Sequence, residues 1–158
     1  MKDTLISIVM PEFNAEAYLN DCIQSIVDQG YSDWELLAVD DQSTDESFGI
    51  LEEWSKKDSR IHCFKNSKKG LIHALRLAYS KSKGELVTRM DADDLMHKAK
   101  LNKMSKALLN RGKGNLAVCG VHYFKEEGPL GEGYKRYASW LNELTIAERN
   151  YDEIYKEC

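Results

Sequence analysis

The chain has 158 residues, enough for one domain with a hydrophobic core of ordinary size. Hydrophobic residues make up 42% and charged residues 30%, a mixture that excludes an intrinsically disordered chain. The formal net charge of -4 gives no attraction for nucleic acid, and no apolar run approaches the roughly 20 residues that span a bilayer. Four cysteines without a Cys-x-x-Cys pair argue against a zinc site and a disulfide framework. We therefore expect a cytoplasmic protein with reduced thiols, no transmembrane segment and no signal peptide.

Short apolar runs, typical of buried strands, alternate with amphipathic stretches in which apolar residues recur at helical spacing. In chain order, the predicted elements are a strand at 5–10, a helix capped by Asn14, a strand at 34–39, a helix at about 45–57, a strand at 61–64, a helix after Gly70, a strand at 85–90, a helix at 97–109, a strand at 116–124 and a helical stretch at 137–154.

Strands separated by helices of this length indicate βαβ units and a mostly parallel sheet. Right-handed crossovers then bring the carboxyl ends of the strands to one edge of the sheet. In open sheets of this kind, ligands bind at that edge, where the strand order reverses. The sequence therefore predicts an α/β fold with its functional residues directly after the strands.

Acidic side chains follow two of the predicted strands. Asp40 and Asp41 come after the second strand, and Asp91, Asp93 and Asp94 come after the fourth. Carboxylates gathered at one edge repel one another unless a cation is present. Mg²⁺ or Mn²⁺ suits such a place, because these ions accept one or two carboxylates and complete their shells with water and phosphate oxygens. The pattern predicts a diphosphate bridged to the protein by a metal ion.

Three segments of the sequence resemble the motifs of family 2 glycosyltransferases. Residues 7–14, Ser-Ile-Val-Met-Pro-Glu-Phe-Asn, resemble the first strand of that family and its Pro-Thr-Tyr-Asn ending. Residues 39–45, Val-Asp-Asp-Gln-Ser-Thr-Asp, are similar to its Val-Asp-Asp-Gly-Ser-Thr-Asp turn. Residues 83–94 resemble its Lys-Gly-Glu strand followed by Asp-Ala-Asp-Asp. The three motifs stand in the family's order and cover roughly the first 125 residues.

The resemblance implies a GT-A fold, which is a Rossmann-like three-layer αβα sandwich with a mostly parallel sheet. It also implies inverting transfer of a sugar from a nucleotide diphosphate, in many members a UDP-sugar, to an acceptor hydroxyl. By position, the donor-binding residues would be Pro11, Glu12 and Phe13 at the base and ribose, Asp41 accepting a hydrogen bond from the base, Asp91 and Ala92 near the ribose and sugar, and Asp93 as the direct metal ligand with Asp91 beside it.

Three positions depart from the family pattern. Glu12 replaces a Thr or Ser, which puts the choice of base or sugar in question. Gln42 replaces a Gly, which puts the tightness of that turn in question. Arg76 stands where the family often has Asn, and its guanidinium either pairs with a donor phosphate or forms a surface salt bridge. Lys69 belongs to a short basic run that either steers a diphosphate or is simply solvated.

The last part of the chain shows no acidic motif that supplies a general base, so the catalytic residue is unknown. We expect residues 1–125 to form the donor-binding domain and residues 126–158 to begin a helical acceptor-side region that is truncated. Tyr134 and Tyr137 either line an acceptor pocket or pack against the sheet. The acids of the final helical stretch, Glu143, Glu148, Asp152 and Glu153, are interpreted as a solvated face.

Three functions fit these observations. The first is a metal-assisted glycosyltransferase acting on a saccharide, lipid-linked or other hydroxyl acceptor, in polysaccharide biosynthesis and either free in the cytoplasm or peripheral to the inner face of the membrane. The second is a catalytically silent module that binds nucleotide sugar. The third, a sugar nucleotidyltransferase, is disfavoured because the first strand is not followed by a Gly-rich basic loop. An incomplete sheet edge would also favour a homodimer.

Overall fold

The computed structural model describes residues 4–125 and 128–156, and the chain divides into two compact units, Met1–Ser105 and Lys106–Cys158. The first unit contains a four-stranded sheet in the order β3-β2-β1-β4, in which every neighbouring pair is parallel. The strands are β1 (Ile6–Glu12), β2 (Trp34–Asp40), β3 (Ile61–Lys65) and β4 (Leu86–Arg89). Successive strands run outward from β1 to β3, and β4 then lies on the other side of β1, so the strand order reverses next to β1. The first four predicted strands are confirmed.

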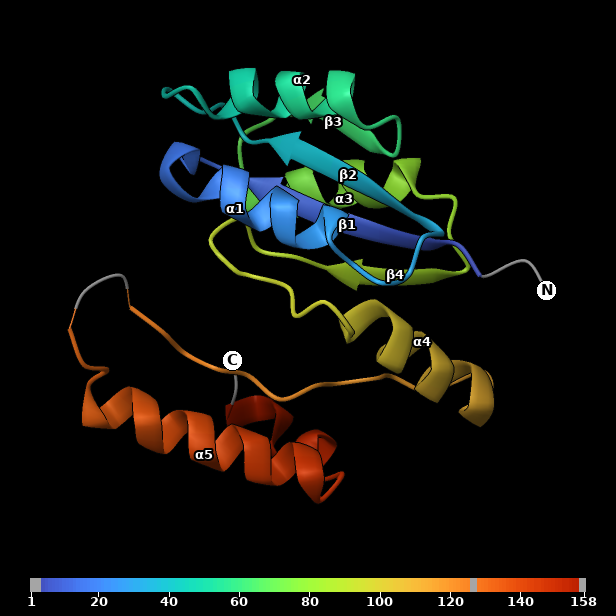
Figure 1. The fold of residues 1–158 in the computed structure, drawn as a ribbon, viewed down its shortest axis with the longest axis vertical. Coiled ribbons are helices and arrows are strands. Elements are labelled where there is room, and N and C mark those ends of the chain that lie inside the picture. The colour runs from blue at the N-terminus through green and yellow to red at the C-terminus, as the bar shows by residue number, and fades with distance from the viewer. Residues whose placement is uncertain (1–3, 126–127, 157–158) are drawn as a thin grey trace. The chain divides into compact units, whose positions relative to one another are not determined.

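Helices cover both faces of this sheet, which gives the first unit three layers (Figure 1). The helices α1 (Glu16–Val27) and α2 (Ser47–Lys57) pack on one face, where their buried apolar residues join those of β1 and β2 in the larger core cluster. The helix α3 (Leu71–Lys81) packs on the other face through Ala74 and Ala78. Because both faces are covered, all seven residues of β1 and of β2 are buried.

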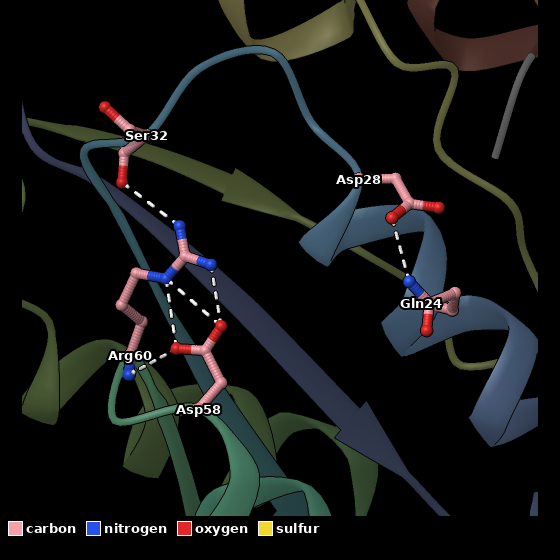
Figure 2. A network of polar contacts seen from close by, with 5 residues as sticks. All are labelled: Gln24, Asp28, Ser32, Asp58 and Arg60. Atoms are coloured by element: carbon pink, nitrogen blue, oxygen red, sulfur yellow. Dashed lines mark hydrogen bonds and ion pairs between the residues drawn. The ribbon is translucent and has the colours of Figure 1, made fainter.

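The edge of the sheet at the amino end of β2 is held by one arginine (Figure 2). Arg60 forms an ion pair with Asp58 at 2.6 Å, and a second guanidinium nitrogen donates to the carbonyl of Ser32 at 3.3 Å. The guanidinium also lies 3.8 Å from the ring centroid of Trp34, within the range of a cation–π contact. The Arg60 side chain holds the pKa of Asp58 below its usual value. This network joins the turn before β2 to the turn before β3, at the end of the sheet away from the acidic loops.

Asn14 does not cap the first helix, which corrects the prediction from the sequence. α1 begins at Glu16, and its N-cap residue is Ala15, which makes no side-chain capping hydrogen bond. Asn14 has a φ of 50° and its side-chain oxygen accepts a hydrogen bond from the backbone N–H of Thr44 at 2.8 Å. The amide therefore bonds a loop from another part of the chain, which no local sequence pattern reports.

The helix α4 (Lys100–Arg111) runs from the first unit into the second, which also holds α5 (Glu132–Ile146) and a 3₁₀ helix, η1 (Asn150–Lys156). The predicted strand at 116–124 is wrong, because no residue of that segment belongs to a strand. Val121 donates its N–H to Oδ1 of Asn142 at 2.7 Å and accepts from Nδ2 at 2.9 Å. A side-chain amide of α5 thus takes the place that a neighbouring strand would have.

Two further predictions concern the chain as a whole. The thiols of Cys22, Cys63 and Cys119 are free, while Cys158 lies outside the described residues. Within residues 4–125 and 128–156, no helix is both long and apolar enough to cross a bilayer.

Candidate functional site

The carboxyl ends of β1 and β2 lie side by side and bring two acidic residues together. Glu12 pairs with Asp40 in the parallel register, and the N–H of Asp41 donates to the carbonyl of Glu12 at 2.8 Å. Paired residues of neighbouring strands project to the same face of a sheet, so the two side chains meet. Both are almost wholly buried, Glu12 at 4% and Asp40 at 3% exposure.

Burial of the Glu12 carboxyl raises its pKa from 4.5 to about 8, with further increases from its contact with Asp40 and from the charges of Asp40 and Asp45. The hydroxyl of Ser43, which lies 3.3 and 3.4 Å from the two carboxyl oxygens, acts in the opposite direction. Glu12 is therefore mostly protonated at neutral pH. It presents a neutral carboxyl where the family motif has a hydroxyl residue.

Asp41 fixes the loop that connects β3 to α3. Its Oδ1 accepts hydrogen bonds from Nδ2 of Asn66 at 2.7 Å and from the N–H of Gly70 at 2.8 Å. Gly70 has a φ of 134°, a conformation that a residue with a Cβ rarely adopts. The side chain of Gln42 also reaches this loop, because its Nε2 donates to the carbonyls of Asn66 and Ser67 at 3.3 and 3.4 Å.

The loop after β1 is bonded directly to the loop after β2. The N–H groups of Asn14 and Ala15 donate to the hydroxyls of Ser43 and Ser47, at 3.0 and 2.8 Å. Thr44 donates its own N–H to the side chain of Asn14 in return. The ends of the first two motifs are thus locked together by reciprocal hydrogen bonds.

The acidic residues of the third motif follow β4, on the other side of β1. The N–H of Met90 donates to the carbonyl of Val9, so the Asp91 that follows lies next to the carboxyl end of β1. Asp91 is half exposed and pairs with Arg89 at 2.6 Å, while Asp93 is exposed. Burial and then the charges of Asp93 and Asp91 raise the pKa of Asp94. The acids therefore form an anionic loop whose charge its neighbours only partly balance.

The acidic residues after β2 and those after β4 lie at the same edge of the sheet, as the sequence predicted, and the end of strand β1 lies between them. Pro11 and Glu12 stand at the end of this central strand, with Asp41 on the β2 side and Asp91 on the β4 side. Ala92, in the turn after β4, is buried. The described residues contain no group of three or more His, Cys, Asp or Glu side chains that converge on one point.

Phe13 and Arg76, two of the predicted donor-binding residues, are both exposed but differ in their contacts. Phe13 is 46% exposed directly after β1, and the ammonium of Lys69 lies 4.0 Å from its ring centroid. Arg76 is exposed on α3 and forms no ion pair with another described residue. The surface salt bridge considered for Arg76 is thus not present in the described part of the chain.

Asn66 and Lys69 are the residues of this edge that sequence reasoning missed or set aside. The sequence signal that could have indicated these residues is a short basic run before a helix, with Asn66 on one side and Gly70 on the other. In the second unit, Tyr134 and Tyr137 pack on Tyr123, with ring centroids 5.8 and 6.2 Å apart.

Known proteins resemble this chain in sequence and in fold. The family described as Glycosyl transferase family 2 matches residues 7–156. An uncharacterized glycosyltransferase of Haemophilus influenzae is 37% identical over 126 residues, which are 77% of this chain and 50% of that protein. The Escherichia coli UDP-Glc:alpha-D-GlcNAc-diphosphoundecaprenol beta-1,3-glucosyltransferase WfgD is 37% identical over 125 residues, 78% of this chain and 47% of that protein.

The crystal structure of S. aureus TarS 1-349 matches with a TM-score of 0.61 and 25% identity, over 67% of this chain and 32% of that one. This likeness confirms the predicted GT-A class of fold, with its mostly parallel sheet between layers of helices. The chain spans half or less of the length of these relatives. The matched family covers the sheet, the three motifs and the described part of the second unit, and the chain belongs to glycosyl transferase family 2.

Proposed function

We propose that this chain provides the donor-binding part of a glycosyltransferase that takes a sugar from a nucleotide diphosphate, with a UDP-sugar as the donor. The observation that carries the proposal is the position of Asp91 and Asp93 beside the end of β1, across that strand from Asp41. A nucleotide bound across β1 reaches both regions, with its base at the Asp41 side and its diphosphate at the Asp93 side. The name of the Escherichia coli relative, a UDP-Glc-dependent glucosyltransferase, supports the choice of uridine.

A divalent cation fits the residues that follow β4. Asp91 is half exposed and Asp93 is exposed there, and burial together with the charges of these two carboxylates raises the pKa of Asp94. Mg²⁺ and Mn²⁺ bind through one or two carboxylates and fill the remaining positions with phosphate oxygens and water. In this proposal Asp93 is the direct ligand and Asp91 lies beside it. The bound cation would supply a Lewis acid that stabilises charge on the departing diphosphate.

The neutral carboxyl of Glu12 and the exposed ring of Phe13 complete the proposed donor site. A buried acid that stays protonated adds no negative charge to a place that receives a diphosphate. Phe13 offers a flat apolar surface for a base. Arg76, which has no ion-pair partner among the described residues, is available for a donor phosphate.

The acceptor belongs to the same proposal. We infer a saccharide hydroxyl, on a lipid-linked or other carrier, because the Escherichia coli relative is named for a diphosphoundecaprenol-linked acceptor. Transfer with inversion, which the family resemblance implies, a role in polysaccharide assembly and a location in the cytoplasm or at the inner face of the membrane are part of the same proposal. Binding of nucleotide sugar without transfer is the second candidate, because Glu148 and Asp152 of the second unit are exposed and engaged with Arg111 and Arg149.

The test is a calorimetric titration with UDP and UDP-sugars, with and without Mn²⁺, on the wild type and Asp93→Asn. We expect the variant to keep its fold and to lose at least about tenfold in metal-dependent affinity, because one charged ligand of the cation is removed. Glu53→Gln is the matched control, an acid-to-amide change on the exposed surface of α2. Unchanged metal-dependent affinity in Asp93→Asn would contradict the assignment, and product formation with a saccharide acceptor would distinguish transfer from binding alone.

A further inference from the structure

Two exposed side chains from distant parts of the sequence meet at the edge of the sheet. Phe13 directly follows β1, and Lys69 lies two residues before α3 begins. The ammonium of Lys69 stands 4.0 Å from the centroid of the Phe13 ring, well inside the distance at which a cation and an aromatic face attract. The ring is still 46% exposed, so part of it remains free for a ligand.

The backbone on both sides of Lys69 is held to the end of β2. Asn66 and Gly70 both donate hydrogen bonds to the carboxylate of Asp41, at 2.7 and 2.8 Å. Gln42 donates to the carbonyls of Asn66 and Ser67. A lysine in an untethered loop samples many positions because its stem is flexible. Here the loop is fixed at its base and the ammonium lies over a ring.

The neighbouring lysines differ from Lys69 in this respect. Lys65 lies over the ring of Phe48, a residue of α2, at 4.1 Å. Lys68 is exposed, and no side-chain contact is found for it among residues 4–125. Lys69 forms no ion pair within the described ranges, although Asp41 is bonded to the residue next to it. Its three N–H donors therefore remain available to a ligand.

Asp41 and Lys69 present complementary chemistry to a base. An ionised carboxylate only accepts hydrogen bonds, and an ammonium only donates them. Oδ2 of Asp41 accepts from the Gly70 N–H at 2.9 Å and keeps further lone-pair capacity. A ring N–H next to a carbonyl matches this pair, and that arrangement occurs in uracil and in guanine. Cytosine and adenine have an unprotonated ring nitrogen next to an amino group, which reverses the pattern.

We propose that Lys69 is a specificity-determining residue of the donor site, which donates a hydrogen bond to a carbonyl of the base while Asp41 accepts from the ring N–H beside it. This inference rests on the proposed function, because it assigns a partner to the base end of the same nucleotide. Phe13, whose ring is 46% exposed, keeps the Lys69 ammonium at this edge of the sheet.

The test compares the dissociation constants of UDP, GDP, CDP and ADP, measured by calorimetry with Mn²⁺ present. The variants are Lys69→Met, which keeps the stem and removes the charge, Lys69→Arg, which keeps the charge, and Lys68→Met as the matched control. A charge-assisted hydrogen bond to a base is worth roughly tenfold or more in affinity. We expect wild type and Lys68→Met to favour UDP or GDP over CDP and ADP, and the choice between UDP and GDP identifies the base.

In Lys69→Met the favoured nucleotide should bind roughly tenfold more weakly while CDP changes little, and Lys69→Arg should restore part of the loss. The free nucleoside of the favoured base should show the same loss. Equal losses for UDP and CDP would overturn the inference, since they indicate a contact with the phosphates, and so would an unchanged Lys69→Met. Wild-type protein that binds none of the four nucleotides would overturn the proposed function, whereas normal UDP binding in Lys69→Met removes this inference alone.

Discussion

Glu12 shows how one substitution in a family motif changes the chemistry of a strand end. A Thr or Ser at that position is neutral at every pH, whereas Glu12 is neutral only because it is buried against Asp40. The sequence reveals the replacement, but the raised pKa depends on the register that places Asp40 beside it. No local pattern reports that register.

The pKa of Glu12 predicts a pH dependence of folding stability. The folded-state value of about 8 lies above the ordinary 4.5, so the folded chain holds a proton that the unfolded chain releases between these values. The contribution of Glu12 to stability is thus present below pH 4.5 and is lost as pH rises towards 8. In Glu12→Gln, which does not titrate, the free energy of unfolding relative to wild type should rise by roughly 3 kcal/mol between pH 5 and pH 8. Urea unfolding at a series of pH values measures this, and a pH-independent difference would show that Glu12 is charged in the folded state.

Gln42 is a second residue whose conformation only the structure reveals. Its φ of 66° lies in the left-handed region, which explains why the related motif has a Gly there. The side chain nevertheless donates hydrogen bonds to the carbonyls of Asn66 and Ser67. The unfavourable backbone conformation of Gln42 is therefore accompanied by two hydrogen bonds to the loop that carries Lys69.

Among the elements, the pairing of β4 with β1 depends on a glycine of the Lys-Gly-Glu motif. Gly84 donates its N–H to the hydroxyl of Ser7, which in turn donates to the buried carboxylate of Glu35 at 2.7 Å. A Cβ at residue 84 would lie 2.6 Å from the backbone nitrogen of Ser7 and 2.8 Å from the carbonyl oxygen of Leu5. The sequence reveals the motif, and the close approach of two strands gives its reason.

Gly84→Ala should therefore lower the free energy of unfolding by about 1–3 kcal/mol, because backbone atoms of β1 must move to admit the methyl group. Gly49→Ala is the control in the same unit, since its added Cβ meets its nearest neighbour at an ordinary 3.6 Å in the helix α2. The control should be unchanged or more stable by up to about 1 kcal/mol. Denaturant unfolding followed by circular dichroism compares the two, and equal stabilities would mean that β4 shifts away without loss.

Across the whole molecule, the two units differ in how their backbone is bonded. The first unit has a parallel sheet buried between helices, whereas the segment 115–125 of the second unit contains no helix or strand. Val121 is held there by both atoms of the Asn142 amide. The short apolar run of this segment predicted a strand, but the segment forms none and Leu116 is 90% exposed.

Amide hydrogen exchange should separate these two cases. The slowest exchange is expected in β1 and β2, and the segment 115–125 should exchange quickly apart from Val121. Asn142→Ala should speed the exchange of the Val121 amide at least about tenfold and leave the exchange rates of β1 and β2 unchanged. If Val121 keeps its protection in that variant, its N–H has another acceptor in solution.

The sequence by itself determined the α/β class, the first four strands and the helices between them, because periodicity and spacing are local properties of a chain. It also contains the three motifs that resemble those of family 2 glycosyltransferases. It also predicted that Asp41 and Asp91 would gather at one edge, since parallel strands end together. Only the tertiary structure decided that Asn14 bonds Thr44, that Glu12 lies protonated beside Asp40, that Lys69 stands over Phe13 and that Asn142 replaces a strand partner for Val121. Each of these joins residues at least 20 positions apart, and such contacts depend on strand order and register rather than on any pattern within one segment.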